Sequence, residues 1–296
     1  MNEAHKAFSL PEDRYLAKDK LAFTKHCLEN DLPTVPVICA IDHAQGDSTR
    51  SFHDGTTIEK WMPAIQAAPS RIFIKQIDGA HGSGAFTAKR EGERWRFRGI
   101  LGTSEALHSF CLTNMQGRRG WIVQPEVRPH KELAQRLSPR ALCTARLVTY
   151  IDGPTPRMLF AALRIPVGDS PTDNWSWGLS GNLIAPIDLE SGALGPGRTS
   201  RSPHWPVIIS NAIHPDTGQS IEDYRLPFWE ETKALALRAQ DTLRQIPTAG
   251  WDIAITDSGP IIIETNSGYA IEMHQVALQR GLRRELDPTF SFQRVQ

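Results

Sequence analysis

The stretch that decides the fold lies near the C-terminus and reads Gly250-Trp-Asp-Ile-Ala-Ile-Thr-Asp-Ser-Gly-Pro-Ile-Ile-Ile-Glu-Thr-Asn266. Residues Trp251–Thr256 and Pro260–Thr265 are rich in β-formers, so each indicates a strand. The residues between them, Asp257-Ser258-Gly259, are typical of a three-residue hairpin loop whose glycine takes the left-handed conformation. The stretch therefore predicts a β-hairpin.

Counting outward from this loop sets Asp252 opposite Glu264, and strand alternation puts Asn266 on the same face as Glu264. Two opposed carboxylates repel each other unless a cation lies between them. Oxygen ligands of this kind suit Mg²⁺, with Mn²⁺ as an alternative. The alternative to a metal site is a hairpin whose acids point to water, but Ile261-Ile262-Ile263 indicates a buried strand. The register depends on the loop, because a two-residue loop would move Asp252 out of line with Glu264.

Composition limits the remaining possibilities. The chain has 296 residues, 40% of them hydrophobic, with 33 basic and 33 acidic residues. This balance gives no reason to expect nucleic acid or an anionic membrane as a partner. No run approaches transmembrane length, so we expect no membrane insertion. The four cysteines are scattered and the N-terminus lacks an apolar signal core, which favours reduced thiols in a cytoplasmic protein. Metal-ligand histidine spacing and G-x-S-x-G are absent, which argues against zinc hydrolysis and triad chemistry.

Helix and strand patterns predict an α+β fold, because hairpins surround helices without a regular β-α-β alternation. Helices are expected over residues 19–30 (capped by Asp19), 57–67 and 228–245. Strands are expected over 35–38, 71–76, 121–127, 146–150 and 159–164, with a polar hairpin over 86–100 and a long loop over 169–182. The predicted domains are an N-terminal lobe over 1–68, a small lobe over 69–128 and a large lobe over 129–296.

A lysine and a glycine-rich loop follow one another in the first half of the chain. Lys75 lies near the end of an apolar strand, and Gly79-Ala-His-Gly82-Ser83-Gly84 comes after it. Lysine supplies charge and a glycine loop supplies backbone N–H groups, a combination that suits nucleotide phosphates. The pattern is neither the Walker motif nor the dinucleotide fingerprint. A glycine-rich hairpin without a ligand is the alternative.

Two arginines fall on neighbouring expected strands among apolar residues. Arg146 and Arg164 are seldom buried there without a partner, so either a phosphate, a substrate carboxylate or a structural ion pair is expected. Asp173, Asn174 and Asn182 lie in the loop that carries Trp175 and Trp177. Tryptophan beside such residues suits a polar ligand such as a sugar, and equally suits an ordinary loop anchor.

Taken in order, these pieces resemble the ATP-grasp superfamily, in which two α+β lobes grip a nucleotide. The resemblance covers nearly the whole chain from about residue 15. Thr144-Ala-Arg146-Leu-Val-Thr-Tyr150, Ala161-Ala-Leu-Arg164 and the terminal hairpin resemble more narrowly the sugar-transfer-associated ATP-grasp group. The hairpin is the most specific part and the glycine loop the least.

The resemblance implies a role for each matched residue. Lys20 and Lys75 would contact phosphates, and Gly79, Gly82, Ser83 and Gly84 would cover them. Trp121–Val127 would be the hinge that reads adenine through its backbone, with Gln124, Glu126 and Val127 at the nucleotide. Glu132 is a candidate for the ribose. Asp252, Glu264 and Asn266 would hold Mg²⁺, Arg146 and Arg164 would steady the transferred phosphate, and Asp173, Asn174 and Asn182 would face the substrate.

The chain also departs from the superfamily. A basic residue that some of its ligases carry two positions before the metal aspartate is Gly250 here, and an expected Gly-Gly pair is replaced by Gly178-Leu-Ser-Gly181. The implied activity is a Mg²⁺-requiring, ATP-dependent carboxylate–amine (or thiol) ligase that forms an acyl phosphate. A small-molecule kinase on the same fold and a non-catalytic nucleotide-binding module stay open. The acceptor would be a small molecule or a peptide- or sugar-derived compound, and a homodimer stays open.

Overall fold

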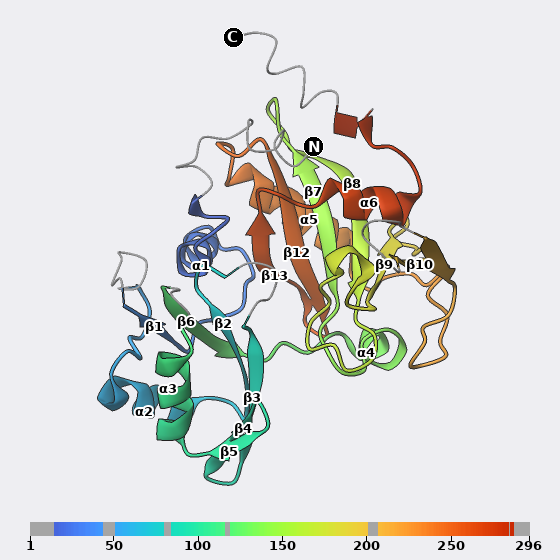
Figure 1. Cartoon of the computed structure of the whole chain (residues 1–296). Coiled ribbons are helices and arrows are strands. Elements are labelled where there is room, and N and C mark those ends of the chain that lie inside the picture. The colour runs from blue at the N-terminus through green and yellow to red at the C-terminus, as the bar shows by residue number, and fades with distance from the viewer. Residues whose placement is uncertain are drawn as a thin grey trace. The chain divides into compact units, whose positions relative to one another are not determined.

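The computed structural model describes residues 15–43, 51–79, 84–115, 119–200, 207–283 and 285–286. The chain divides into two compact units, one over Tyr15–Val127 and one that contains Arg128–Gln296. In the described residues each unit holds one antiparallel sheet with helices (Figure 1), so the predicted α+β class is confirmed. The three-lobe division with boundaries at 68/69 and 128/129 stays a prediction.

The unit over residues 15–127 is built on a sheet with the strand order β1-β6-β2-β3-β4-β5 in the described residues. Its strands are β1 (Cys39–Asp42), β2 (Arg71–Gln76), β3 (Phe86–Glu91), β4 (Arg94–Phe97), β5 (Ile100–Gly102) and β6 (Gly120–Pro125). Its helices are α1 (Lys20–Glu29), α2 (Ile58–Ala67) and α3 (Ser104–Thr113). Trp61 on α2, Trp95 on β4 and Trp121 on β6 anchor the core that α2 and α3 close against the sheet.

Two strand predictions in this unit need correction. The first strand begins at Cys39, whereas the sequence predicted it over 35–38. Pro36 has no N–H to donate to a ladder, and the first bond to β6 comes from Ile38 N to Val123 O at 2.8 Å. Likewise β6 ends at Pro125, two residues before the predicted end at Val127. Proline thus limits the pairing at β1, whereas beyond the end of β6 Glu126 N still donates to Arg71 O at 3.2 Å.

The second unit is built on a sheet with the order β11-β10-β9-β8-β7-β12-β13 in the described residues. Its strands are β7 (Thr144–Tyr150), β8 (Arg157–Ile165), β9 (Leu183–Pro186), β10 (Gly197–Ser200), β11 (Ile208–Asn211), β12 (Thr248–Thr256) and β13 (Gly259–Asn266). Its helices are α4 (Lys131–Arg136), α5 (Trp229–Asp241) and α6 (Ile271–Leu278), and the loop over 169–182 contains a 3-10 turn, η4 (Ser176–Gly178).

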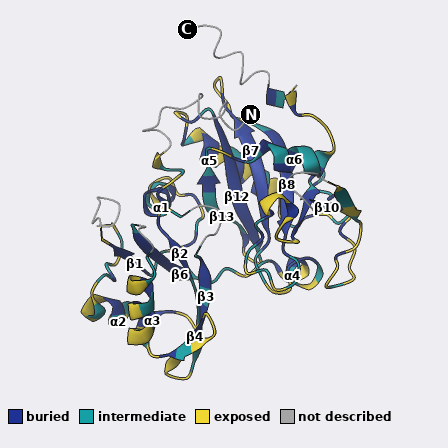
Figure 2. Ribbon diagram, in the orientation of Figure 1, coloured by how far each residue is buried: buried dark blue, intermediate teal, exposed yellow. Residues whose placement is uncertain are grey.

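Helices α5 and α6 cover opposite faces of this sheet (Figure 1). Thr149 on β7 faces α5, because its hydroxyl donates to Gln240 Oε1 at 2.7 Å. The alternate β7 residues Val148 and Tyr150 face the other way and pack with Ile271 of α6. The central strands are buried along most of their length, whereas the exposed residues lie mainly on loops and outer helix faces (Figure 2). Alternation then places Arg146 on the α6 face of the sheet.

The β12–β13 hairpin reaches the predicted register by a different route. Its loop has two residues, since Thr256 pairs with Gly259, and the predicted three-residue loop is wrong. A two-residue loop alone would set Asp252 opposite Ile263. A β-bulge between Asp252 and Ile253 absorbs Ile263, so that Asp252 pairs with Glu264 after all.

Candidate functional site

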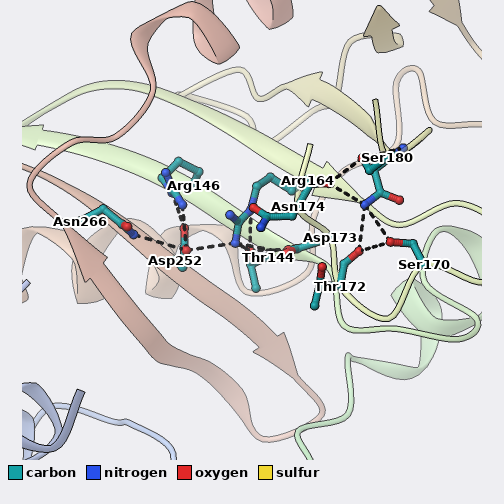
Figure 3. Close-up of polar contacts among 11 residues, drawn as sticks. Thr144, Arg146, Arg164, Ser170, Thr172, Asp173, Asn174, Ser180, Asp252 and Asn266 are labelled. Carbon is teal, nitrogen blue, oxygen red and sulfur yellow. Dashed lines mark hydrogen bonds and ion pairs between the residues drawn. The ribbon is translucent and has the colours of Figure 1, made fainter. Parts of the chain in front are cut away.

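Asp252 is the centre of a buried charge cluster on the α6 face of the second sheet (Figure 3). Its side chain is fully buried, and it lies on β12 between β7 and β13. Arg146 is directly opposite on β7 and binds it through two bonds, Nε to Oδ1 and Nη2 to Oδ2, the second at 2.8 Å. On the other side, Glu264 is directly opposite on β13. One carboxylate is therefore flanked by a guanidinium and by a second carboxylate.

Arg164 on β8 extends the cluster toward the loop over 169–182 (Figure 3). Its Nη2 lies 3.0 Å from Asp252 Oδ2 and 3.2 Å from Asp173 Oδ1. Thr144 completes the connection, because its hydroxyl accepts from Arg164 Nη2 at 2.7 Å and donates to Asp173 Oδ2 at 2.6 Å. Sequence reasoning missed the role of Thr144. The signal was available, since Thr144 and Arg146 are two residues apart on one strand and so share a face.

Charge and burial set the protonation of this cluster. Burial alone would favour the neutral acid at Asp252, but Arg146 and Arg164 outweigh it and lower the pKa of Asp252. At Asp173 the balance is reversed: burial raises the pKa of Asp173, although Arg164 opposes the rise. The acids also raise the pKa of Arg164 against the effect of burial. Asp252 is thus the carboxylate that this face holds ionised.

The residues present fit a magnesium ion. An ionised carboxylate has about four lone-pair sites. On Asp252, Arg146 takes two, Arg164 takes one and the Asn266 amide takes the fourth, so a metal could use that fourth site only once the amide turns over. Glu264 pairs directly with Asp252 across β12 and β13. Asn266 Nδ2 lies 3.5 Å from Asp252 Oδ2, and turning its amide over would present an oxygen instead. No group of three His, Cys, Asp or Glu gathers in the described parts of the chain, so the amide would be the third ligand.

Gly250 explains how Arg146 reaches Asp252. A Cβ at Gly250 would lie 2.4 Å from Tyr269 Cβ and 3.2 Å from Arg146 Cδ. Gly250 pairs with Val148 on β7, so it adjoins the strand position that carries Arg146. The absence of a side chain at this position leaves room for the arginine to lie along the sheet.

The three loop residues expected at the substrate differ in their surroundings. Asp173 is buried against Arg164 and Thr144. Asn182 is fully buried and holds the loop together: its Nδ2 donates to Ser170 Oγ and to the carbonyls of Thr172 and Asn174, and its Oδ1 accepts from Val167 N. Asn174 is partly exposed. The first two therefore lie where loop anchors lie, and a substrate role for any of the three stays a prediction.

The loop itself is held in an uncommon backbone conformation. Ser176, Trp177 and Gly178 all have positive φ, at 46°, 59° and 81°. Gly178 has no room for a side chain, because a Cβ would lie 2.2 Å from Ser200 O. Trp175 is buried, whereas Trp177 is 47% exposed. The segment Gly178-Leu-Ser-Gly181, which replaces the expected Gly-Gly pair, thus begins in a tightly packed turn. The indole of Trp177 in this turn is exposed to solvent.

The predicted phosphate-binding residues lie in the unit over 15–127. Lys20 is the first residue of α1, and its ammonium donates to Gly79 O. Lys75 on β2 is buried. Gly79 and Gly84 both lie beside Gln76, because a Cβ at Gly79 would lie 2.8 Å from Gln76 Cβ and one at Gly84 would lie 3.3 Å from Gln76 Nε2. Gly82 and Ser83 lie outside the described residues.

The predicted hinge residues already have protein partners. Gln124 is buried and its Nε2 donates to Val35 O at 3.0 Å. Glu126 forms a two-bond ion pair with Arg71, and Val127 follows it as the last residue of this unit. In the second unit, Glu132 on α4 accepts from Tyr224 Oη at 3.3 Å. A hinge that reads adenine through its backbone leaves these side-chain contacts intact.

Comparisons with known proteins identify the family and the fold. A family model described as sugar-transfer associated ATP-grasp matches residues 5–290. No curated protein matches the chain. Among solved structures, D-alanyl-alanine synthetase A from Vibrio cholerae is similar over 93% of this chain and 65% of its own, with 13% identity and a TM-score of 0.52. This likeness shows the ATP-grasp fold.

Two other solved structures are similar at lower TM-scores. D-cycloserine synthetase DcsG has 12% identity over 92% of this chain and 69% of its own, with a TM-score of 0.45. The biotin carboxylase domain of the Hydrogenobacter thermophilus 2-oxoglutarate carboxylase, in complex with MgADP, ADP and bicarbonate, has 12% identity over 91% of this chain and 45% of its own, with a TM-score of 0.49. The chain spans about half to two thirds of the length of these proteins.

Proposed function

We propose that this chain, which belongs to the sugar-transfer associated ATP-grasp family, is an ATP-dependent ligase that joins a carboxylate to an amine or a thiol. The observation that carries the proposal is the opposition of buried Asp252 and half-buried Glu264 across β12 and β13, with Asn266 beside them. Opposed acids repel each other, and a metal cation bound to both would relieve the repulsion beyond what Arg146 and Arg164 supply to Asp252. The resemblance of the chain to ATP-grasp ligases supplies the reaction class.

The ligands of the cation would be Asp252, Glu264 and Asn266. Bound Mg²⁺ would neutralise the charge of the triphosphate and of the transition state for phosphoryl transfer. Arg146 and Arg164 hold Asp252 ionised, so the ligand is ready without a proton having to leave.

The nucleotide phosphates would be held by Lys20 and Lys75, with the glycine loop from Gly79 to Gly84 above them. A carboxylate oxygen of the substrate would attack the γ-phosphorus of ATP, and the bond to the β,γ-bridging oxygen would break to leave ADP and an acyl phosphate. Attack by an amine or thiol on the acyl carbon would then release inorganic phosphate. Arg146 and Arg164 would stabilise the charge on the transferred group through the edges that they turn away from Asp252.

Positioning and electrostatics would do most of the catalytic work, because phosphoryl transfer requires little covalent help from a protein. This accounts for the lack of a nucleophilic triad in the sequence. The acceptor class, a small molecule or a peptide- or sugar-derived compound, is part of the proposal. So is Mn²⁺ as a replacement for Mg²⁺.

The test is a product assay. Release of ADP would be measured with Mg²⁺ across panels of acids, amines, thiols and sugars, in the presence of hydroxylamine. Transfer to a carboxylate yields a hydroxamate, which we expect. A phosphorylated hydroxyl product without hydroxamate would replace the ligase with a kinase. Tight ATP binding without ADP release across the panel would leave a non-catalytic nucleotide-binding module.

A further inference from the structure

An ion-paired bridge lies beside the predicted phosphate-binding lysine. Arg119 binds the Asp42 carboxylate through two bonds, Nε to Oδ1 at 2.9 Å and Nη2 to Oδ2. Its remaining nitrogen, Nη1, donates to Asp19 Oδ2. Asp42 on β1 is fully buried, and Asp19 and Arg119 are mostly buried. One guanidinium therefore joins the sheet to the residue that precedes α1.

Asp19 connects the Arg119 ion pair to the start of α1, where Lys20 lies. Its other oxygen, Oδ1, caps α1 by accepting from Leu21 N and Ala22 N, both at 2.9 Å. Lys20, the first residue of the helix, is fixed at both ends. Its backbone N donates to Ile77 O at 3.1 Å and its ammonium donates to Gly79 O. The position of the Lys20 ammonium at the start of the glycine loop thus depends on where α1 begins.

The bridge fixes more of the local geometry than the capping of α1 requires. Asp19 would cap α1 with one oxygen without any arginine, and a buried ion pair is weak evidence of stabilisation by itself. A guanidinium bound to two carboxylates instead fixes distance and angle, because its donors form a rigid planar fork. Here that fork sets the start of α1 relative to β1, which pairs with β6 in the same sheet as β2 and Lys75.

We propose that Arg119 is a positioning residue for nucleotide binding: by bridging Asp42 to Asp19 it fixes Lys20 at Gly79, where the ammonium receives the phosphates of ATP. The inference rests on the proposed function in taking Lys20 as a phosphate ligand. Arg119 acts through Lys20, so its substitution should weaken the binding of ATP, which has the phosphates, and not the binding of adenosine, which lacks them.

The experiment compares ATP and adenosine binding by calorimetry in the wild-type chain and in Arg119→Lys, which keeps the charge but loses the fork. We expect the affinity for ATP with Mg²⁺ to fall about tenfold or more while the affinity for adenosine stays within about twofold. In Lys20→Met the same pattern is expected, and the double variant should lose no more ATP affinity than Lys20→Met alone. Arg96→Gln, which removes an exposed arginine paired with Glu91, is the control and should change neither affinity.

A second measurement does not require nucleotide. Hydrogen exchange of the Leu21 and Ala22 amides should quicken in Arg119→Lys, while α3 amides keep their wild-type rates. Asp42→Asn is a milder variant that should act in the same direction if Arg119→Lys folds poorly. Additive losses with Lys20→Met, or equal losses for ATP and adenosine, would overturn the positioning role. A wild-type chain that binds no ATP would overturn the proposed function. Unchanged exchange of the Leu21 and Ala22 amides would overturn the claim that Arg119 restrains the start of α1, whatever the nucleotide result.

Discussion

Asp252 on β12 lies directly opposite Glu264 on β13, although the loop between the two strands is one residue too short to produce this pairing by itself. The bulge that absorbs Ile263 makes up the difference. The bulge disrupts the ladder at Ile263, and in exchange the two acids become directly paired.

Removing one acid should remove the metal. We expect Glu264→Ala to reduce Mg²⁺-dependent ATP binding by about tenfold or more, equivalent to ~1.4 kcal/mol, because Asp252 alone has one lone-pair site left. Calorimetry with and without Mg²⁺ measures the difference. Glu231→Ala, which alters an exposed acid on α5 in the same unit, is the control. Equal Mg²⁺ dependence in wild type and Glu264→Ala would rule out the metal assignment.

A methyl group at Gly250 should disturb Arg146. Because a Cβ there would lie 2.4 Å from Tyr269 Cβ, we expect Gly250→Ala to lower the free energy of unfolding, by about 1–3 kcal/mol. Nucleotide binding should weaken as well, since the arginine loses its path to Asp252. Gly268→Ala is the matched control, as a Cβ there meets nothing within 4 Å. Urea unfolding of both variants measures the contrast, and equal stabilities would contradict it.

His274 should make the fold sensitive to mild acid. Burial, together with the charge of Arg146, lowers the pKa of His274 to about 3, whereas an unfolded histidine titrates near ~6.5. Between these values the unfolded chain binds the proton and the folded chain does not, so stability is full above about pH 6.5 and falls as the pH decreases, by at most ~1.4 kcal/mol per unit. Urea unfolding at pH 7, 6 and 5 should show this slope in wild type and a shallower one in His274→Gln. The exposed His53→Gln should keep the wild-type slope.

Asn182 should be needed for the conformation of the Trp loop. Asn182→Asp keeps the shape but loses the two N–H donors that three acceptors share, and each donated bond contributes about 1 kcal/mol. We expect a loss of about 2 kcal/mol in the free energy of unfolding and a change in the fluorescence of buried Trp175. Asn211→Asp, at a half-buried position on β11, should change stability by no more than about 0.5 kcal/mol. A variant as stable as wild type would show that the loop does not depend on this amide.

Much of the fold could be predicted from local patterns because local chemistry produces it. Asp19 caps α1, β2 has its predicted bounds, and Pro227 precedes α5, whose residues Leu235 and Ala239 are buried as the helical period requires. Proline caused the error at β1, where the missing N–H of Pro36 limits the ladder. The bulge could not be predicted, because three successive isoleucines do not indicate which of them leaves the ladder.

The sequence by itself determined which chemistry the chain carries: two acids and an amide on one hairpin, two arginines on neighbouring strands, and lysines beside a glycine loop. Those residue types and their alternation are local, so they can be read without a structure. Only the tertiary structure decided their partners. Arg146 and Arg164 both bind Asp252, Asp173 and Asn182 turn inward, and Arg119 joins Asp42 to Asp19, residues far apart in the chain. These pairings depend on which strands become neighbours, and on which charged groups are buried and therefore need a partner of opposite charge. Both are properties of the packed sheet and not of any one segment.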